Sequence, residues 1–295
     1  MDEEIMEKYV KAGKIAAEAL QYGKALIKPG VLVVEVLDKI EEKIIELGGG
    51  IAFPAQISLN ETAAHFCPLL GDETKFSDQL VKLDVGVHID GYVADTALTV
   101  DLSGKYGDLI KASAEALDKA LALIKPGVSI GEIGRAIHEV ITGYGFSPIR
   151  NLSGHGLGHY DVHTKPSIPN FDTGDERFLE EGVVFAVEPF ASTGAGAVYE
   201  SGEAGVFMLV DKRPVRNPIT RQVLQEIEKY NNLPFAKRWL QKKFGAKVAF
   251  AFRELKLLEC LKDFPPLVDE SKGMVSQAEH SVIVTADGCK VFTRV

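Results

Sequence analysis

The hexapeptide LIKPGV occurs twice, at residues 26–31 and again at residues 123–128. After each copy, apolar residues recur about four positions apart, which predicts a Pro-Gly turn followed by an amphipathic helix. A glycine, a Phe, a Pro, an Asn and a His come next, and strands rich in β-branched residues follow. Two copies are too few for a solenoid. We therefore expect an α+β fold of two related half-domains, residues 1–110 and 111–295, with pseudo-two-fold symmetry around an antiparallel sheet and one site between them.

Four acidic residues occupy matching places in the strand-like segments of the two halves. LVKLDVGV resembles VVFAVEPF, and VADTALTV resembles QAEHSVIV, so Asp84 and Asp95 correspond to Glu188 and Glu279. Asp-Gly at residues 90–91 predicts a two-residue hairpin turn. That register places Asp84 opposite residue 97 and Asp95 opposite residue 86, with both acids on one face of the sheet. An unpaired carboxylate is costly in such an apolar setting. We therefore favour a metal site over the alternative that both are surface acids beside a turn.

Three histidines stand four residues apart in GHGLGHYDVH, at positions 155, 159 and 163. The glycines argue against a helix, but in an extended segment the three would still share a face. One metal ligand, one substrate contact and one bystander are as reasonable as three ligands. His155 and the four acids would suit Mn²⁺, Fe²⁺, Co²⁺ or a pair of Zn²⁺ ions. A water held between two such ions, about 3.5 to 4 Å apart, attacks carbonyl groups, so the predicted chemistry is hydrolysis.

A long segment separates the two acids of the second half. PITRQVLQEIEKYNN, LPFAKRWLQKKFG and KVAFAFRELKLLECLKDF predict three helices, which form a compact inserted subdomain over residues 212–264. Its basic stretch could contact ribosomal RNA, but the acidic overall charge favours a solvated helix face. The cations concerned are Lys237, Arg238, Lys242, Lys243 and Lys247.

The composition is that of an ordinary globular protein, with 46% apolar residues in a chain of 295. Its 33 Lys and Arg against 42 Asp and Glu give a net charge of −9, which argues against sequence-independent binding of nucleic acid. The chain shows no signal-peptide pattern and no apolar run long enough to span a membrane, so we expect a soluble cytoplasmic protein. Its three cysteines form no CxxC pair and are expected to be reduced. A catalytic Cys67 close to His65 is disfavoured, because free cysteine is usually an inert apolar residue.

The motifs together resemble a known family. NETAAHF, KLDVGVHIDGYVADTA, NLSGHGLGHYDVH, FAVEPFASTG, DFPPL and AEHSVIV are similar, over essentially the whole chain, to type II methionine aminopeptidases of peptidase family M24. The resemblance implies the pita-bread fold with a helical insertion, and removal of the N-terminal methionine from nascent proteins by a metal-bridging hydroxide. The implied partners are nascent polypeptide N-termini and, transiently, the ribosome. A monomer that binds neither DNA nor membrane is expected.

Positions matched to the family imply a role for each ligand. Asp84 would be a bidentate ligand of one ion, and Asp95 and Glu279 would bridge two divalent ions of Co, Mn, Fe or Zn. His155 and Glu188 would bind the other ion, and Glu188 would also shuttle a proton.

The resemblance also assigns residues to the substrate. His65 and His163 would hydrogen-bond the scissile peptide, with His163 nearer the developing oxyanion. Phe53, Val162 and Phe264 would help to line the methionine pocket, and a thioether suits such an apolar lining.

Two other functions stay open. A prolidase or Xaa-Pro aminopeptidase has the same fold, but those relatives carry an additional N-terminal domain, whereas here the repeat begins by residue 26. A catalytically inactive binding homologue is the second alternative. All five ligand positions are filled, which argues against it.

Overall fold

Each half of the chain begins with two helices in the computed structural model, which describes residues 1–294. The bounds are α1 Glu3–Leu26 and α2 Val33–Glu46 in the first half, and α3 Gly107–Leu123 and α4 Ile130–Gly143 in the second. Gly30 and Gly127 occupy the same place in the two copies of LIKPGV and have φ angles of 88° and 84°. Only glycine adopts such angles without strain, so each copy makes the turn that leads into the second helix.

An antiparallel sheet in the order β1-β3-β4 forms the centre of the first half. Its strands are β1 Gly50–Leu59, β3 Leu80–Ile89 and β4 Tyr92–Asp101. Ile89 pairs with Tyr92 across the predicted turn, and Asp84 pairs with Ala97. The register predicted for this hairpin is therefore confirmed.

The second half is built around a five-stranded sheet in the order β17-β16-β8-β6-β7. Its strands are β6 Ser153–Gly158, β7 Asp161–Pro169, β8 Val184–Val187, β16 His280–Val284 and β17 Cys289–Val291. Strand β4 joins the two halves: Asp95 N donates to Ser281 Oγ over 2.9 Å, and Glu279 N donates to Ala97 O over 3.0 Å. These contacts bring the acids of both halves to one place.

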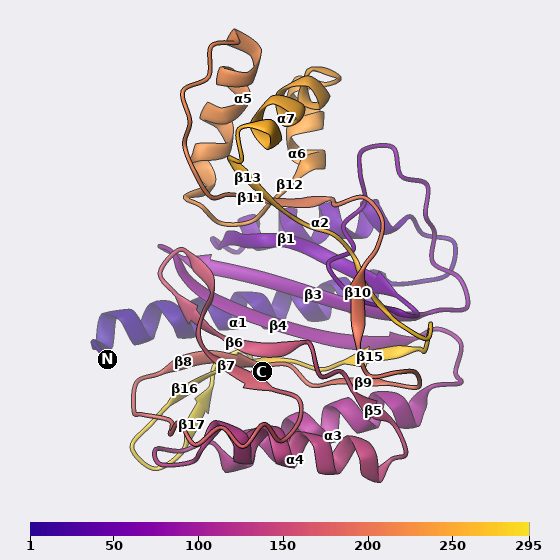
Figure 1. The fold of residues 1–295 in the computed structure, drawn as a ribbon, viewed down its shortest axis with the longest axis vertical. Coiled ribbons are helices and arrows are strands. Elements are labelled where there is room, and N and C mark those ends of the chain that lie inside the picture. Colours follow the sequence, from indigo (N-terminus) through magenta and orange to yellow (C-terminus); the bar gives the residue numbers. More distant parts are fainter. Residues whose placement is uncertain (295) are drawn as a thin grey trace.

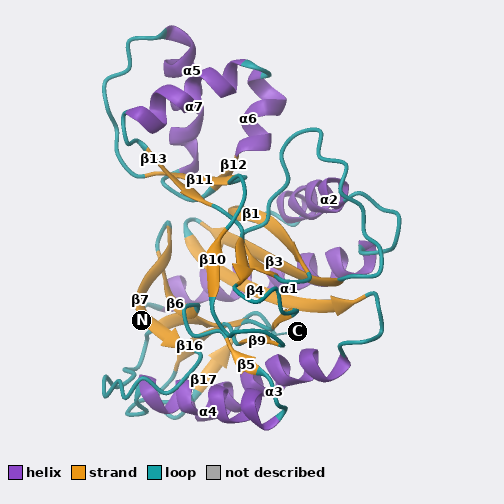
Figure 2. Ribbon diagram, turned by 45° about the vertical axis from the view of Figure 1, so that its right-hand side comes forward, coloured by secondary structure: helices purple, strands orange, loops and turns teal. Residues whose placement is uncertain are grey.

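The helices lie on the outer faces of the sheets (Figure 1). α1 and α2 pack on the first-half sheet in the largest buried apolar cluster, and α3 and α4 pack on the second-half sheet in another. Figure 2 shows the sheets as the central layer with helices on either side. Within residues 1–294, no helix is both long and apolar enough to cross a membrane.

Three helices form a separate group at the top of Figure 1 and enclose their own apolar cluster. They are α5 Pro218–Ile227, α6 Lys237–Phe244 and α7 Lys247–Leu257, with a 3₁₀ turn, η1, at Glu228–Tyr230. At their base lies a sheet in the order β12-β11-β13, made of Phe235–Ala236, Val206–Leu209 and Leu261–Phe264. The predicted helix over 247–264 was too long: it ends at Leu257, because β13 pairs with β11 and Glu259 has a positive φ of 55°.

Short strands complete the structure between the halves. Two three-stranded sheets have the orders β10-β14-β2 and β15-β9-β5. Their strands are β2 Thr62–Ala64, β5 Ser147–Pro148, β9 Phe190–Ser192, β10 Val198–Glu200, β14 Leu267–Asp269 and β15 Val275–Gln277.

Candidate active site

The five predicted metal ligands line one cavity of about 210 Å³ between the two halves. Asp84 and Asp95 come from the β3–β4 hairpin and His155 from β6. Glu188 follows β8 directly, and Glu279 lies between β15 and β16. The pseudo-two-fold arrangement thus brings residues almost 200 positions apart in the sequence into a single site.

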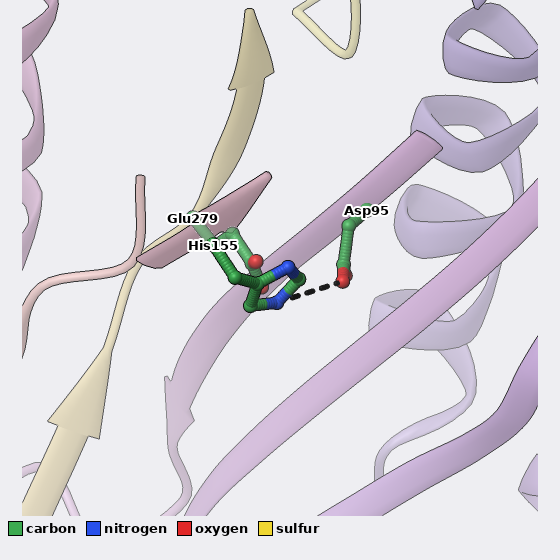
Figure 3. A group of neighbouring side chains, drawn as sticks. All are labelled: Asp95, His155 and Glu279. Atoms are coloured by element: carbon green, nitrogen blue, oxygen red, sulfur yellow. Dashed lines mark ion pairs between the residues drawn. The ribbon is translucent and has the colours of Figure 1, made fainter. Parts of the chain in front are cut away.

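The ligand atoms of three of these residues are close enough to share an ion. Atoms of Asp95, His155 and Glu279 lie within 4.8 Å of one another (Figure 3). His155 Nε2 is 3.7 Å from Asp95 Oδ2 and 3.7 Å from Glu188 Oε1. One carboxylate oxygen each of Asp84, Asp95 and Glu279 is buried without a hydrogen-bond partner among residues 1–294. Buried oxygens of this kind need a counter-ion, so the donor set fits a divalent cation.

The pKa values of the site residues also indicate a site for a divalent cation. Burial is the main cause that raises the pKa of Asp84 to about 7, and burial together with neighbouring carboxylates holds the pKa values of Asp95 and Glu279 well above their usual range. Burial and then the charge of Asp84 raise the pKa of Glu188 in the same way. Burial lowers the pKa of His155 to about 3, so its imidazole is neutral and has a lone pair for a metal ion.

His65 and His163 lie in the same cavity. The ring of His163 is 4.4 Å from that of His155, and the ring of His65 is 5.8 Å from that of Phe264, edge to face. Burial lowers the pKa of His65 to about 4 and also lowers that of His163. Both imidazoles are therefore neutral at pH 7 and can donate a hydrogen bond from one nitrogen. His65 has a φ of 67°, an uncommon angle for a residue other than glycine, and such strain is often found at functional sites.

Apolar side chains form the other part of the cavity wall. Phe53, Val162 and Phe264 all line it. The ring of Phe53 lies over Gly86, where an added Cβ would be 2.1 Å from a ring carbon. Glycine at this position therefore leaves room for the ring. Val206 and Pro234 extend the lining from the base of the helical group.

Two glutamines of the site were missed by the sequence interpretation. Gln277 Nε2 lies 3.5 Å from Glu188 Oε2 and 3.4 Å from Glu279 Oε2, and donates to both carboxylates. Its position two residues before Glu279 in an extended segment is the signal that could have identified it, because such residues share a face. Gln56 lines the cavity from β1. No sequence pattern indicates that position, because regular alternation along a strand would place Gln56 on the face opposite to Phe53.

Two residues that the sequence interpretation considered and disfavoured lie outside the cavity. His159 Nε2 is 2.8 Å from Asp90 O and its ring packs on Tyr92, so it joins the tips of two hairpins. Cys67 is buried, which raises its thiol pKa to about 12, and its Sγ lies 2.7 Å from Arg238 Nη1. A protonated thiol held in this way is a poor nucleophile.

The basic stretch of the helical group is largely neutralised by ion pairs. Lys237 pairs with Glu203 over 2.7 Å and Lys243 with Glu226 over 2.8 Å. Arg238 departs from the expected solvated face: its side chain is fully buried. Lys242, Lys243 and Lys247 are exposed, as expected, whereas Arg238 makes an internal contact.

Comparisons with known proteins agree with this geometry. A family model described as metallopeptidase family M24 matches residues 7–229. A methionine aminopeptidase of Archaeoglobus fulgidus is 48% identical over 296 residues and covers both chains completely. A solved methionine aminopeptidase of Thermotoga maritima has a TM-score of 0.74 at 24% identity, covering 100% of this chain and 98% of that one. Prolidase of Pyrococcus furiosus has a TM-score of 0.65 at 20% identity, and the match covers 100% of this chain but 65% of the prolidase.

The solved structures establish the fold and the sequence relative establishes the family. The duplicated halves around one cavity are the pita-bread arrangement, and the buried Asp, His and Glu cluster is of the kind that binds divalent metal. Together with the full-length identity, these findings show that the chain belongs to metallopeptidase family M24 and groups there with methionine aminopeptidases.

Proposed function

We propose that this chain is a metal-dependent aminopeptidase that removes methionine from the N-termini of polypeptides. The observation that carries the proposal is the meeting of four carboxylates, two buried and two largely buried, and one neutral imidazole in a cavity that also has an apolar wall. The acids and the imidazole suit hydrolysis, and the apolar wall suits an apolar first residue. The 48% sequence identity to a curated methionine aminopeptidase supports methionine as this first residue.

The proposed metal ligands are Asp84, Asp95, His155, Glu188 and Glu279, holding two divalent ions. Asp95 and Glu279 would bridge, because both are almost fully buried and each has an oxygen without a partner. Divalent ions in such a site polarise a carbonyl group and lower the pKa of water. Co, Mn, Fe and Zn all accept these ligands.

The chain's own residues would move the protons and hold the substrate. In hydrolysis, a water oxygen bonds to the methionine carbonyl carbon, the peptide C–N bond breaks, and the water proton reaches the leaving amine. Glu188 carries that proton, since burial and the neighbouring charge of Asp84 raise the pKa of its carboxyl group and so make it a better proton acceptor. Neutral His163 donates to the developing oxyanion and His65 to the amide that follows it. A donor aimed at such a charge contributes about 3 to 4 kcal/mol.

Several finer assignments belong to the same proposal. The helical group is the insertion of a type II enzyme, spanning 212–264 within a single catalytic domain of half-repeats 1–110 and 111–295. Phe53, Val162 and Phe264 form the methionine pocket. The substrates are nascent chains, which implies a cytoplasmic location, a monomer and a transient ribosome contact.

Peptide cleavage by the metal-loaded protein tests the proposal. Purified protein is incubated with Met-Ala-Ser and with Xaa-Pro peptides, and release of the first residue is quantified. We expect methionine from Met-Ala-Ser and no cleavage before proline. Cleavage of Xaa-Pro peptides alone would instead assign a prolidase-type activity.

An inactive binding homologue makes a different prediction. Metal-loaded protein would release no methionine, and Asp95→Ala would leave both stability and ligand binding unchanged. We expect Asp95→Ala to abolish ion binding and turnover together, with ion content measured by elemental analysis.

A further inference from the structure

An irregularity in β1 turns an additional polar side chain into the cavity. Between Phe53 and Gln56, β1 takes three steps while its partner β3 takes two, from Gly86 to Asp84. In a regular strand, residues three apart point to opposite faces. The extra residue places Phe53 and Gln56 on the same face, and both line the cavity.

A buried carboxylate holds this bulge in place. The backbone N–H of Ala55 donates to Glu41 Oε1 over 3.2 Å. Trp239 Nε1 donates to the other oxygen of Glu41 over 2.8 Å, and Arg238 pairs with Glu41 as well. The direction of Gln56 is therefore set by rigid contacts and does not depend on a flexible loop.

The amide oxygen of Gln56 lacks a partner in this position. Gln56 is 6% exposed, and its Oε1 is buried without a hydrogen bond to any residue of the described chain. It sits directly beside Asp84 across the strands. Turning the amide by 180° exchanges its oxygen and its NH₂ group with little change in shape, so it can present either a donor or an acceptor. An unpaired atom of a buried amide is unfavourable, and a ligand acceptor that meets the NH₂ group, once this group is turned into the place of the unpaired oxygen, restores what is lost.

We infer that Gln56 is a specificity-determining residue that donates an amide hydrogen bond to the thioether sulfur of the substrate's first residue. The inference rests on the proposed function. Most of the apolar wall distinguishes size and shape only, and an apolar pocket separates side chains of similar volume poorly. Among unbranched and branched apolar side chains of this size, methionine alone carries an acceptor. The Gln56 amide gives the pocket a means to select it.

Norleucine is the matched probe, because it replaces the sulfur by a methylene group and keeps the chain length. The measurement compares kcat and KM for Met-Ala-Ser and norleucine-Ala-Ser with metal-loaded protein. The thioether is a weak acceptor, so we expect wild-type protein to favour methionine by roughly three- to tenfold in kcat/KM. The difference should lie mainly in KM, since the contact exists before the reaction as well as during it.

Gln56→Met removes the amide with little change in length. We expect the preference for methionine to fall to about one, with ion content unchanged. Gln222→Met makes the same chemical change on an exposed position of α5 and should keep the wild-type ratio. Competitive inhibition by free methionine and free norleucine gives a binding readout, in which the preference should disappear in the same variant.

Three results would overturn the inference and leave the proposed function in place. Wild-type protein without a preference for methionine over norleucine would refute it without any variant. An unchanged ratio in Gln56→Met would refute it too. A Gln56→Met protein that loses its ions and slows equally on both peptides would assign Gln56 to the metal site. Wild-type protein that releases neither residue would instead overturn the proposed function, and this inference with it.

Discussion

Replacement of Arg238 by methionine tests how the helical group is joined to the catalytic halves. The Arg238 side chain is fully buried and pairs with Glu41, and its Nε lies 3.4 Å from Asp38 Oδ1. Glu41 itself is 6% exposed. Methionine fills much of the same volume but leaves Glu41 buried without its cation.

The cost follows from the uncompensated charge. Breaking a buried ion pair by removing one partner typically costs about 3 to 5 kcal/mol, whereas replacing both partners by uncharged groups costs much less. We therefore expect Arg238→Met to lower the free energy of unfolding by about that amount. Glu41→Gln in the same protein should restore a large part of it, because an amide still accepts from Ala55 N.

The pH dependence of the loss has a defined sign. Burial raises the pKa of Glu41 and Arg238 lowers it, so removal of Arg238 raises it further. In the folded variant, Glu41 then holds a proton that it releases in the unfolded chain, where its pKa is about 4.3. This contribution to stability is retained below that pKa and lost as pH rises. The free energy of unfolding of Arg238→Met should therefore fall further below that of wild type at pH 8 than at pH 5.

Urea unfolding of wild type, both single variants and the double variant at the two pH values measures these quantities. Intrinsic fluorescence of Trp239 follows the helical group, and far-UV circular dichroism follows the whole chain. A loss below about 1 kcal/mol for Arg238→Met, or a double variant less stable than Arg238→Met alone, would refute the reasoning.

Three further outcomes are expected. Metal-free protein in chelator should melt at lower temperature as pH rises from about 7 to 8, because burial raises the pKa values of the four site acids and the folded state holds protons that the unfolded chain releases. The window lies above the pKa of an unfolded histidine, about 6.5, below which the buried histidines have the opposite effect; a melting temperature that rises from pH 7 to 8 contradicts this. His65→Ala and His163→Ala should each lower kcat by about 10²- to 10³-fold with ion content intact, and a variant purified without ions would show that its histidine holds metal. Gly86→Ala should force the Phe53 ring into the cavity, raise KM for methionine peptides and cost about 1 to 3 kcal/mol of stability, unlike Gly143→Ala, where nothing lies within 4 Å.

The β3–β4 hairpin shows what local sequence can predict. Asp90-Gly91 fixes a two-residue turn, and the turn fixes which residues pair, so the shared face of Asp84 and Asp95 follows from a few adjacent positions. The matching of the two halves then places their partners Glu188 and Glu279. The turn is a local signal and the repeat appears when two short segments are compared, and the hairpin register predicted in this way agrees with the structure.

Gln56 and the end of α7 show where local reasoning stops. Period-two alternation puts Gln56 and Phe53 on opposite faces, and only the bulge held by Glu41 and Arg238, about 200 residues apart, reverses that. Likewise, the segment after Leu257 has helical periodicity but becomes a strand because it finds a partner in β11. The direction of Gln56 and the strand after Leu257 both depend on contacts between residues that are far apart in the sequence.

The contact of Arg238 with Glu41 also limits how a protein of this architecture can lose or gain the helical group. Deleting residues 212–264 would remove the cation that pairs with Glu41. Grafting these residues onto a shorter relative that lacks an acid at position 41 would leave the Arg238 guanidinium without this counter-ion. Either exchange therefore demands a compensating substitution nearly two hundred residues away in the second helix.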